Sequence, residues 1–215
     1  MVSLLNRLKE EMIDILFPRT CMACGKEGKY ICEKCSLFLS ETSSIFKIGG
    51  LEELVSVWEY EGLIKNIILK IKYDGVFDAI NELVEKAFRI REQYVPEDTI
   101  ITFVPMFKKK QKRRGFNQAE LIAKKIGEAT RREVMPLLEK IKDTPSQTEL
   151  NKEERILNVK DSFRPLKLIL NKSLPENVLL VDDVWTSGAT MQECSKVLKR
   201  AGVKRVWGFT LARTV

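Results

Sequence analysis

The chain has 215 residues, of which 44% are hydrophobic, enough for a real core and one main domain with room for a small appendage. It has no histidine, which excludes serine–histidine and cysteine–histidine catalysis and every histidine metal ligand. The net charge is +7, and it is concentrated: Lys108–Arg114 (KKKQKRR) holds six basic residues, whereas the rest of the chain holds 31 basic and 30 acidic residues.

Residues 1–20 carry apolar side chains at helical spacing up to Pro18, which predicts a short N-terminal amphipathic helix. Acidic residues occur in it beside basic ones, so packing on the body of the protein is favoured over membrane attachment. The sequence shows no secretory leader, and no apolar run approaches the roughly 20 residues of a membrane span. We therefore expect a cytoplasmic protein with no transmembrane segment.

Four of the five cysteines follow the pattern C-x2-C-x7-C-x2-C, and Gly25 after the second one suits a tight turn with positive φ. Two such pairs supply four thiolates to a tetrahedral ion, and zinc is the expected metal because residues 21–46 are too few for a core of their own. The alternative, two disulfides, suits an exported protein better. The predicted ligands of this structural, non-catalytic zinc are Cys21, Cys24, Cys32 and Cys35. Cys194 is expected to be a buried apolar residue.

Strands and helices are predicted to alternate over residues 47–215, the main domain. The predicted strands are 54–60, 99–105, 134–138, 177–181 and 203–212, and the predicted helices are 62–72, 77–93, 117–129 and 190–201. The polar stretch 142–160 is expected to be a mobile loop. This alternation predicts an α/β fold, a parallel sheet with helices on both faces, whose ligands bind beyond the carboxyl ends of the strands.

The basic segment Lys108–Arg114 is expected to be a loop after the strand 99–105. Such charge runs are commonly solvated, but this position also fits a local anionic partner. With Phe107 and Phe116 beside it, the segment would be able to follow a nucleic-acid backbone while the rings stack on bases, although such rings are more often simple packing. Asn117 is interpreted as a helix cap rather than as a residue that reads a base.

Residues 178–190, VLLVDDVWTSGAT, place two aspartates after a buried strand, followed by a hydroxyl-rich turn with one glycine that leads into a helix. The backbone amides of the turn and the helix N-terminus form a cradle for a phosphate dianion. Asp182 and Asp183 cannot bind the same phosphate, but they would accept hydrogen bonds from ribose hydroxyls and hold magnesium through water. A phosphorylated sugar therefore satisfies both halves of the motif.

This stretch resembles the signature that binds phosphoribosyl pyrophosphate (PRPP) in type I phosphoribosyltransferases, with Ser187 where threonine is usual. Together with RRGFNQAE at 113–120, TPSQTELNKEERILNV at 144–159 and the cysteine pairs, the chain is similar over nearly its whole length to the ComF (ComFC) competence family. That family joins a zinc-finger-like N-terminus to a phosphoribosyltransferase-like domain and is associated with uptake of single-stranded DNA during natural transformation.

The resemblance implies a protein that binds PRPP with magnesium. It also implies single-stranded DNA and proteins of the competence machinery as further partners. The alternative is an active phosphoribosyltransferase with an unidentified base or amine as acceptor. A transcriptional regulator with the same fold is a third hypothesis, but the sequence shows no helix-turn-helix pattern that would support it. Fold-level similarity alone does not establish a reaction.

The resemblance also implies individual roles. Thr186–Thr190 would hold the 5-phosphate, Pro105–Lys108 the pyrophosphate, and residues 144–158 would form a lid with Arg155 and Asn158 as contacts. The implied PRPP contacts are Asp182, Asp183, Thr186, Ser187, Gly188, Ala189, Thr190, Pro105, Met106, Phe107 and Lys108. The basic residues assigned to nucleic acid or another anion, with a solvated role equally open for the arginines, are Lys109, Lys110, Lys112, Arg113, Arg114 and Arg155.

Overall fold

The computed structural model of the chain describes residues 18–42, 45–91, 97–144, 157–167 and 174–214. Most of the predicted N-terminal helix, most of the predicted lid and Arg155 lie outside these residues. The chain divides into two compact units, Met1–Ser40 and Glu41–Val215. Among the described residues, no helix has the length and apolar character needed to cross a membrane.

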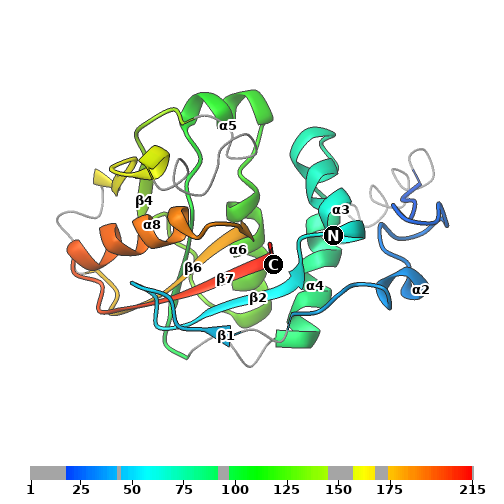
Figure 1. Ribbon diagram of the computed structural model, residues 1–215, viewed down its shortest axis with the longest axis horizontal. Helices are drawn as coiled ribbons and strands as arrows, with labels where there is room; N and C mark the ends of the chain where they lie inside the picture. The colour runs from blue at the N-terminus through cyan, green and yellow to red at the C-terminus, as the bar shows by residue number, and fades with distance from the viewer. Residues whose placement is uncertain (1–17, 43–44, 92–96, 145–156, 168–173, 215) are drawn as a thin grey trace, which may run out of the picture. The chain divides into compact units, whose positions relative to one another are not determined.

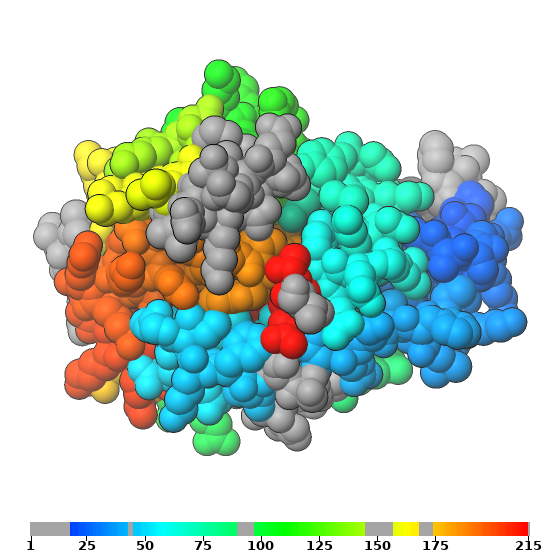
Figure 2. Space-filling model, viewed as in Figure 1, coloured from blue at the N-terminus to red at the C-terminus, as the bar shows by residue number. Residues whose placement is uncertain are grey.

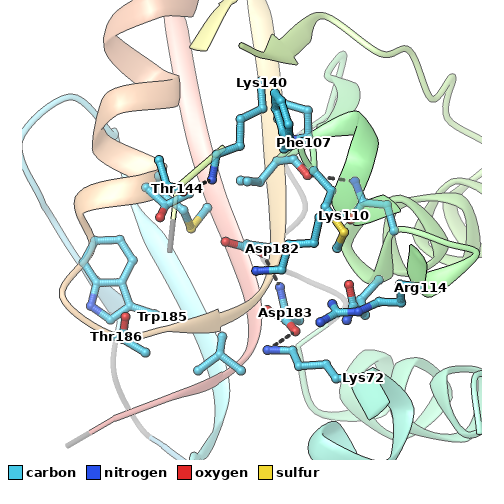
Figure 3. Close-up of a pocket in the computed structure, with 18 of the residues that line it drawn as sticks. Lys72, Phe107, Lys110, Arg114, Lys140, Thr144, Asp182, Asp183, Trp185 and Thr186 are labelled. Carbon is cyan, nitrogen blue, oxygen red and sulfur yellow. Dashed lines mark hydrogen bonds and ion pairs between the residues drawn. The ribbon is translucent and has the colours of Figure 1, made fainter. Parts of the chain in front are cut away.

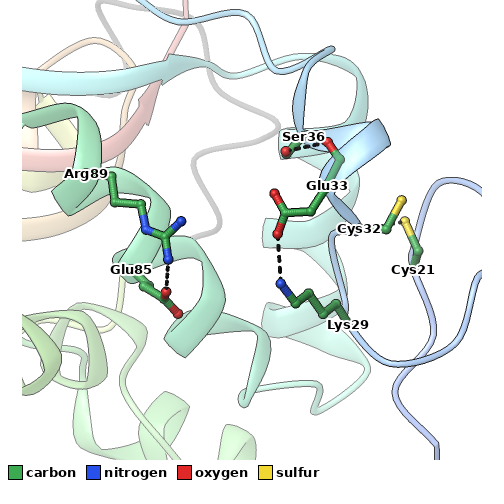
Figure 4. A network of polar contacts seen from close by, with 7 residues as sticks. All are labelled: Cys21, Lys29, Cys32, Glu33, Ser36, Glu85 and Arg89. Carbon is green, nitrogen blue, oxygen red and sulfur yellow. Dashed lines mark hydrogen bonds and ion pairs between the residues drawn. The ribbon is translucent and has the colours of Figure 1, made fainter.

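The described part of the smaller unit folds around its cysteines. Thr20 and Glu27 form an antiparallel bridge, and the one-turn helix α2 (Glu33–Ser36) follows the third cysteine. Gly25 has a φ of 75°, as its position after the second cysteine predicts, and its N–H donates to the Cys21 carbonyl at 2.8 Å. Figure 4 shows an exposed ion pair of this unit, Lys29–Glu33, at 2.7 Å.

A mostly parallel sheet forms the centre of Glu41–Val215, in the order β1-β2-β7-β6-β3 (Figure 1). Its strands are β1 (Ile45–Phe46), β2 (Leu54–Glu59), β3 (Ile100–Phe103), β6 (Asn177–Trp185) and β7 (Arg205–Arg213). β1 is antiparallel to β2, whereas β2, β7, β6 and β3 run parallel to one another. The carboxyl ends of these four strands therefore meet at one edge of the sheet.

Helices cover both faces of this sheet (Figure 1). They are α4 (Ala79–Arg91), α6 (Gln118–Thr130) and α8 (Ala189–Arg200), and the unit also has α3 (Gly62–Tyr73) and α5 (Lys108–Arg114). Adjacent strand residues point to opposite faces. A Cβ at Gly208 would lie 3.1 Å from the Cε of Met191 in α8, whereas the next residue, Phe209, packs its ring 6.4 Å from that of Phe88 in α4. The predicted α/β architecture, with helices on both faces of a parallel sheet, is confirmed.

Apolar spacing decides which side of each helix is buried. α3 buries Ile64, Ile67, Ile68 and Ile71, which lie three, four and seven residues after the first and so share a single helix face. α8 does the same with a stripe that includes Cys194, whose exposure is 0%. Cys194 is therefore a buried core residue, as predicted.

The prediction of a loop at Lys108–Arg114 is wrong, because these residues form helix α5. Lysine, arginine and glutamine are good helix formers, and the segment has no glycine, proline or β-branched residue to interrupt it. Gly115 ends the helix in the left-handed conformation with a φ of 89°, and the basic residues of the last turn suit the negative end of the helix dipole. The concentrated charge is thus displayed on a short helix.

The strand predicted at 134–138 is displaced. Val134 forms a single parallel bridge with Ile101, but the next strand, β4 (Leu138–Lys140), begins after Pro136 and pairs antiparallel with β5 (Phe163–Pro165). Proline has no N–H to continue pairing with β3, so the chain leaves the main sheet there and forms a separate two-stranded one.

Candidate functional site

A cleft of about 630 Å³ opens in Glu41–Val215 beyond the carboxyl ends of the parallel strands (Figure 3). Residues that end or directly follow β2, β3, β6 and β7 line it, together with residues of α3, α5, α6 and α8. In Figure 2 the C-terminal end of β7, in red, reaches the surface beside the segment that holds α3. The volume lies within the range of small-molecule sites, so the cleft has room for a phosphorylated sugar.

The two aspartates lie on the floor of this cleft, within β6 rather than after it. The strand was expected to end at Val181, but it continues to Trp185, and Asp182 is paired with Thr210 of β7. The backbone N–H of Asp183 donates to Oδ1 of Asp182 at 2.8 Å. The Oδ2 of Asp183 lies 2.6 Å from the Nζ of Lys72 in α3 (Figure 3). Asp183 therefore has a direct counter-ion from another element, whereas no ion pair of Asp182 is found in the described part of the chain.

This difference between the two aspartates affects the pKa of Asp182 and the pKa of Lys72. Burial, and then the charge of Asp183, raises the pKa of Asp182 to about 8. Burial alone would lower the pKa of Lys72, but the Asp183 carboxylate outweighs it and raises that pKa. The protein therefore presents an ion pair, Lys72–Asp183, beside an acid that keeps its proton near neutral pH unless a ligand or a cation stabilises its charge.

We expect Asp182→Asn to stabilise the ligand-free protein at pH 8 but not at pH 4. An acid whose pKa is raised on folding binds more protons in the folded than in the unfolded state, so the free energy of unfolding falls as pH rises from the ordinary aspartate pKa of 3.8 to about 8. Each pH unit of that window costs up to about 1.4 kcal/mol. Urea unfolding across this range should show the gain in Asp182→Asn, and not in Asp143→Asn, which removes an exposed acid of the same cleft. A gain that is equal at both pH values would contradict the assignment.

The turn after β6 leads straight into the N-terminus of α8. Gly188 is the N-cap residue, with a φ of 78°, and a Cβ there would lie 2.1 Å from the ring of Trp185. No side chain can therefore replace this glycine without moving the ring. Gly188 offers no side chain to cap the helix, and the first turn of α8 holds no acid; the hydroxyl of Ser187 accepts from the Ala189 N–H only at 3.4 Å. This end of α8 is suited to an anion.

Cations from three elements surround the acid pair: Lys72 of α3, Lys110 and Arg114 of α5, and Lys140 of β4 (Figure 3). Burial, and then the neighbouring charge of Arg114, lowers the pKa of Lys110. Burial, and then Lys110, lowers the pKa of Lys140, whose Nζ donates to Thr144 Oγ1 at 2.7 Å. Cations that repel one another in a partly desolvated cleft gain from an anion placed between them.

The structure brings most of the predicted site together. The predicted residues that line the cleft are Pro105, Met106, Phe107, Lys110, Arg114, Asp182, Asp183, Thr186, Gly188 and Thr190. The predicted residues that do not line it are Lys108, Lys109, Lys112, Arg113, Ser187 and Ala189. Within α5, only the residues one helical turn apart, Lys110 and Arg114, face the cleft, because the helix turns the others away.

Sequence reasoning missed one wall of the cleft, which α3 supplies. The residues of this wall are Lys65, Leu69, Lys72 and Tyr73. They recur at intervals of four, three and one, the spacing of a second helix face beside the buried isoleucine stripe. That spacing is the signal that was present in the sequence. No such spacing marks Lys140 in the sequence, because its place in the cleft depends on the pairing of β4 with β5.

Asn117 caps α6, as predicted. Its Oδ1 accepts from the Ala119 N–H at 3.1 Å, and its Nδ2 donates to the Val104 carbonyl at 3.0 Å. The cap therefore ties the start of α6 to the end of β3. The next residue, Gln118, also lines the cleft, is 4% exposed, and has no hydrogen-bond partner for Nε2 among the described residues.

A second candidate site lies within the smaller unit. The ligand atoms of Cys21, Cys24, Cys32 and Cys35 all lie within 4.8 Å of one another, and none of these cysteines is in a disulfide. The Cys24 and Cys32 sulfurs are 3.7 Å apart, close to the roughly 3.8 Å edge of a tetrahedron with 2.3 Å zinc–sulfur bonds. Burial would raise the pKa of Cys21, but backbone N–H donors, chiefly that of Cys32, outweigh it and lower the pKa to about 6. The cluster fits a four-thiolate metal site, and Figure 4 shows the Cys21 and Cys32 sulfurs close together.

The chain is similar to proteins that are named for competence and for DNA utilization. It is 29% identical over 202 residues to competence protein F of Haemophilus influenzae, covering 89% of this chain and 84% of that protein. It is 28% identical over 194 residues to competence protein ComFC of Streptococcus pneumoniae (90% and 80%) and 27% identical over 208 residues to DNA utilization protein YhgH of Escherichia coli O6:H1 (91% and 89%). No family model matches the chain. These relatives confirm the resemblance to the ComF family.

Proposed function

We propose that this protein acts in the uptake and handling of DNA, as the names of its relatives indicate for them, and that its cleft binds PRPP or a near relative together with magnesium. The observation that carries the proposal is one arrangement. An acid pair, a helix N-terminus with glycine as its N-cap residue and a group of cations face a single cleft at the carboxyl edge of a parallel sheet. Each part of that arrangement suits a different part of the ligand.

The 5-phosphate is assigned to Thr186–Thr190. The support is the N-terminus of α8, where the N-cap residue makes no side-chain cap and the first turn holds no acid, so that the helix dipole favours a dianion. The close fit of Gly188 against Trp185 holds the turn in a fixed shape, so the amides are arranged before the ligand arrives.

The ribose is assigned to Asp182 and Asp183, whose carboxylates would accept hydrogen bonds from two neighbouring hydroxyls. Carboxylate oxygens are also the ligands that magnesium prefers, usually through water, and magnesium would neutralise part of the diphosphate charge. Ionised Asp182 gains most from such partners, because the residues that the structure describes give it no ion pair.

The diphosphate is assigned to the segment Pro105–Phe107 together with Lys110, Arg114 and Lys140. Among the described residues, five cations line the cleft, against the three acids Asp143, Asp182 and Asp183, and the lowered pKa of Lys110 and of Lys140 reflects burial and mutual repulsion. A diphosphate between them would relieve that repulsion.

Isothermal titration with PRPP, with and without magnesium, tests this proposal directly. We expect one site per chain, tighter binding with magnesium, and weaker binding of ribose 5-phosphate. Absence of PRPP binding would refute the assignment. Pyrophosphate release measured with a panel of bases and amines then distinguishes a transferase from a protein that only binds the ligand, and binding without release would exclude catalysis on that panel.

We also propose that α5 and its surroundings bind single-stranded DNA. The Arg114 guanidinium lies 5.5 Å from the ring centroid of Tyr73, and Phe77 and Phe116 pack at 5.9 Å, so aromatic rings accompany the basic helix. Tyr73 and Phe77 are among the exposed large hydrophobic residues. Phe107, which precedes the basic helix as its N-cap residue, also lines the cleft. Exposed rings beside cations are the usual means of binding single strands.

Neutralising the α5 residues that face away from the cleft is expected to weaken single-strand binding and to flatten its salt dependence. The variant replaces Lys108, Lys109, Lys112 and Arg113 by glutamine. Each lost phosphate contact lowers the slope of log affinity against log salt by about 0.7. Fluorescence anisotropy with a labelled oligonucleotide measures this, and a control variant replaces Lys124, Lys125, Lys196 and Arg200 of α6 and α8. Equal losses of single-strand affinity in both variants would show a general charge effect and would contradict the proposal.

We further propose that the four cysteines of the smaller unit hold one structural zinc ion. The thiolate spacing and the amide donors around Cys21 support it.

A further inference from the structure

Gln118 brings an unsatisfied amide to the cleft. The residue is 4% exposed and lines the cleft, and its Nε2 has no hydrogen-bond partner among the described residues. Buried polar groups nearly always have a partner, because an unpaired one keeps its desolvation penalty with nothing in return. An apolar side chain of similar length would avoid that penalty. The described residues leave this amide without a partner, so a ligand in the cleft would be able to pair with it.

The surroundings of Gln118 indicate which part of a ligand would pair with its amide. Gln118 is the first residue of α6, directly after Asn117, which binds the Val104 carbonyl. It thus lies beside the start of the Pro105–Phe107 segment and lines the same cleft as Lys110 and Arg114. The N-terminal end of α6 carries the positive end of its helix dipole. The group opposite Gln118 should therefore be anionic and should accept hydrogen bonds.

We propose that Gln118 is a specificity-determining residue that donates its amide N–H to the diphosphate of the ligand, and so separates diphosphate esters from sugar monophosphates. This rests on the proposed function of the cleft as a PRPP site. Phosphate oxygens only accept hydrogen bonds, and the amide nitrogen is a donor, so the match has a defined direction. A ligand without the diphosphate would leave the amide as unsatisfied as it is in the free protein.

The test compares Gln118→Met with wild type, using PRPP, pyrophosphate and ribose 5-phosphate as separate titrants. We expect about tenfold weaker binding of PRPP and of pyrophosphate and unchanged binding of ribose 5-phosphate. We also expect the melting temperature of the ligand-free protein to rise by about 3 °C, because the substitution removes an unpaired buried polar group while nearly keeping the side-chain volume. Higher stability with lower affinity is a combination that a merely structural role would not produce.

Two further variants sharpen the result. Gln118→Glu is isosteric, removes the donor and adds a negative charge, so it should reduce pyrophosphate binding more than Gln118→Met does. Gln111→Met makes the same change on α5 at a residue that does not line the cleft and should leave all three affinities unchanged.

The outcomes separate the two proposals. If wild type binds neither PRPP nor ribose 5-phosphate, the proposed function fails and this inference fails with it. If wild type binds PRPP and Gln118→Met binds it equally well, only the role of Gln118 is overturned. If Gln118→Met lowers the melting temperature and weakens all three ligands alike, Gln118 is a packing residue and the inference is again wrong.

Discussion

Replacing Asp182 and Asp183 together by asparagine should weaken PRPP binding in magnesium by at least about 100-fold. Hydrogen bonds to a charged partner are worth about 1.5–3 kcal/mol each, so losing two of them corresponds to roughly two to four powers of ten in affinity. Removing negative charge from the cleft works in the opposite direction, because it favours an anionic ligand. The loss should dominate, since the hydroxyl and magnesium contacts depend on carboxylates at these positions.

This competition between effects gives the experiment its internal control. Pyrophosphate without magnesium should bind the double variant as tightly as wild type or more tightly, because only the repulsive part of the acid pair acts on it. A second variant, Asp74→Asn with Asp78→Asn, removes two acids of the same unit that do not line the cleft and should keep wild-type PRPP affinity. Loss of pyrophosphate and PRPP together in the Asp182 and Asp183 variant would mean that the cleft itself had been damaged. Unchanged PRPP affinity would remove the acid pair from the site.

The elements that sequence predicts well are those with a local cause. The isoleucine stripe of α3, the buried run of β6 and the Asn117 cap each follow from residues within one or two turns of chain, and the structure has them where the pattern places them. The basic segment was assigned wrongly because its charge was weighed above its helix propensity. The strand near 134–138 was displaced because the effect of Pro136 depends on which neighbour the chain would otherwise pair with.

The same distinction applies to the cleft. The acid pair and the turn after it are contiguous in sequence, so their shared chemistry is readable there. The Lys72–Asp183 ion pair joins residues more than 100 positions apart, and its partners come from α3 and β6, which only the folded sheet brings together. The unpaired amide of Gln118 is likewise a property of the packing around it. Sequence thus predicts what the cleft can bind, while the fold determines how the site is charged before binding.

If the four cysteines hold zinc as proposed, removing it should unfold the smaller unit, whereas Glu41–Val215 should keep its own unfolding transition. Among the described residues of this unit, Ile31 is the one apolar residue other than cysteine that is buried. Burying such a side chain is worth about 1.5–3 kcal/mol, but ordering a backbone costs about 1–2 kcal/mol for every residue. Apolar burial therefore offsets only a small part of the entropy cost of ordering a segment of this length. A structural zinc contributes about 10–16 kcal/mol in small zinc-binding peptides, which is the scale required.

Metal analysis of freshly purified protein should find one zinc per chain, and Cys24→Ser should lower that value sharply. Cys194→Ala supplies the matched control, because it removes a cysteine of the other unit and should leave the zinc content unchanged. Hydrogen exchange should show protection of residues 18–40 lost on chelation, with the amides of β6 and β7 still protected. If residues 18–40 stay protected after the zinc is removed, the unit is held by something other than its four thiolates, and the assignment is wrong. If they lose protection while the sheet does not, the metal is what folds this unit, independently of the cleft.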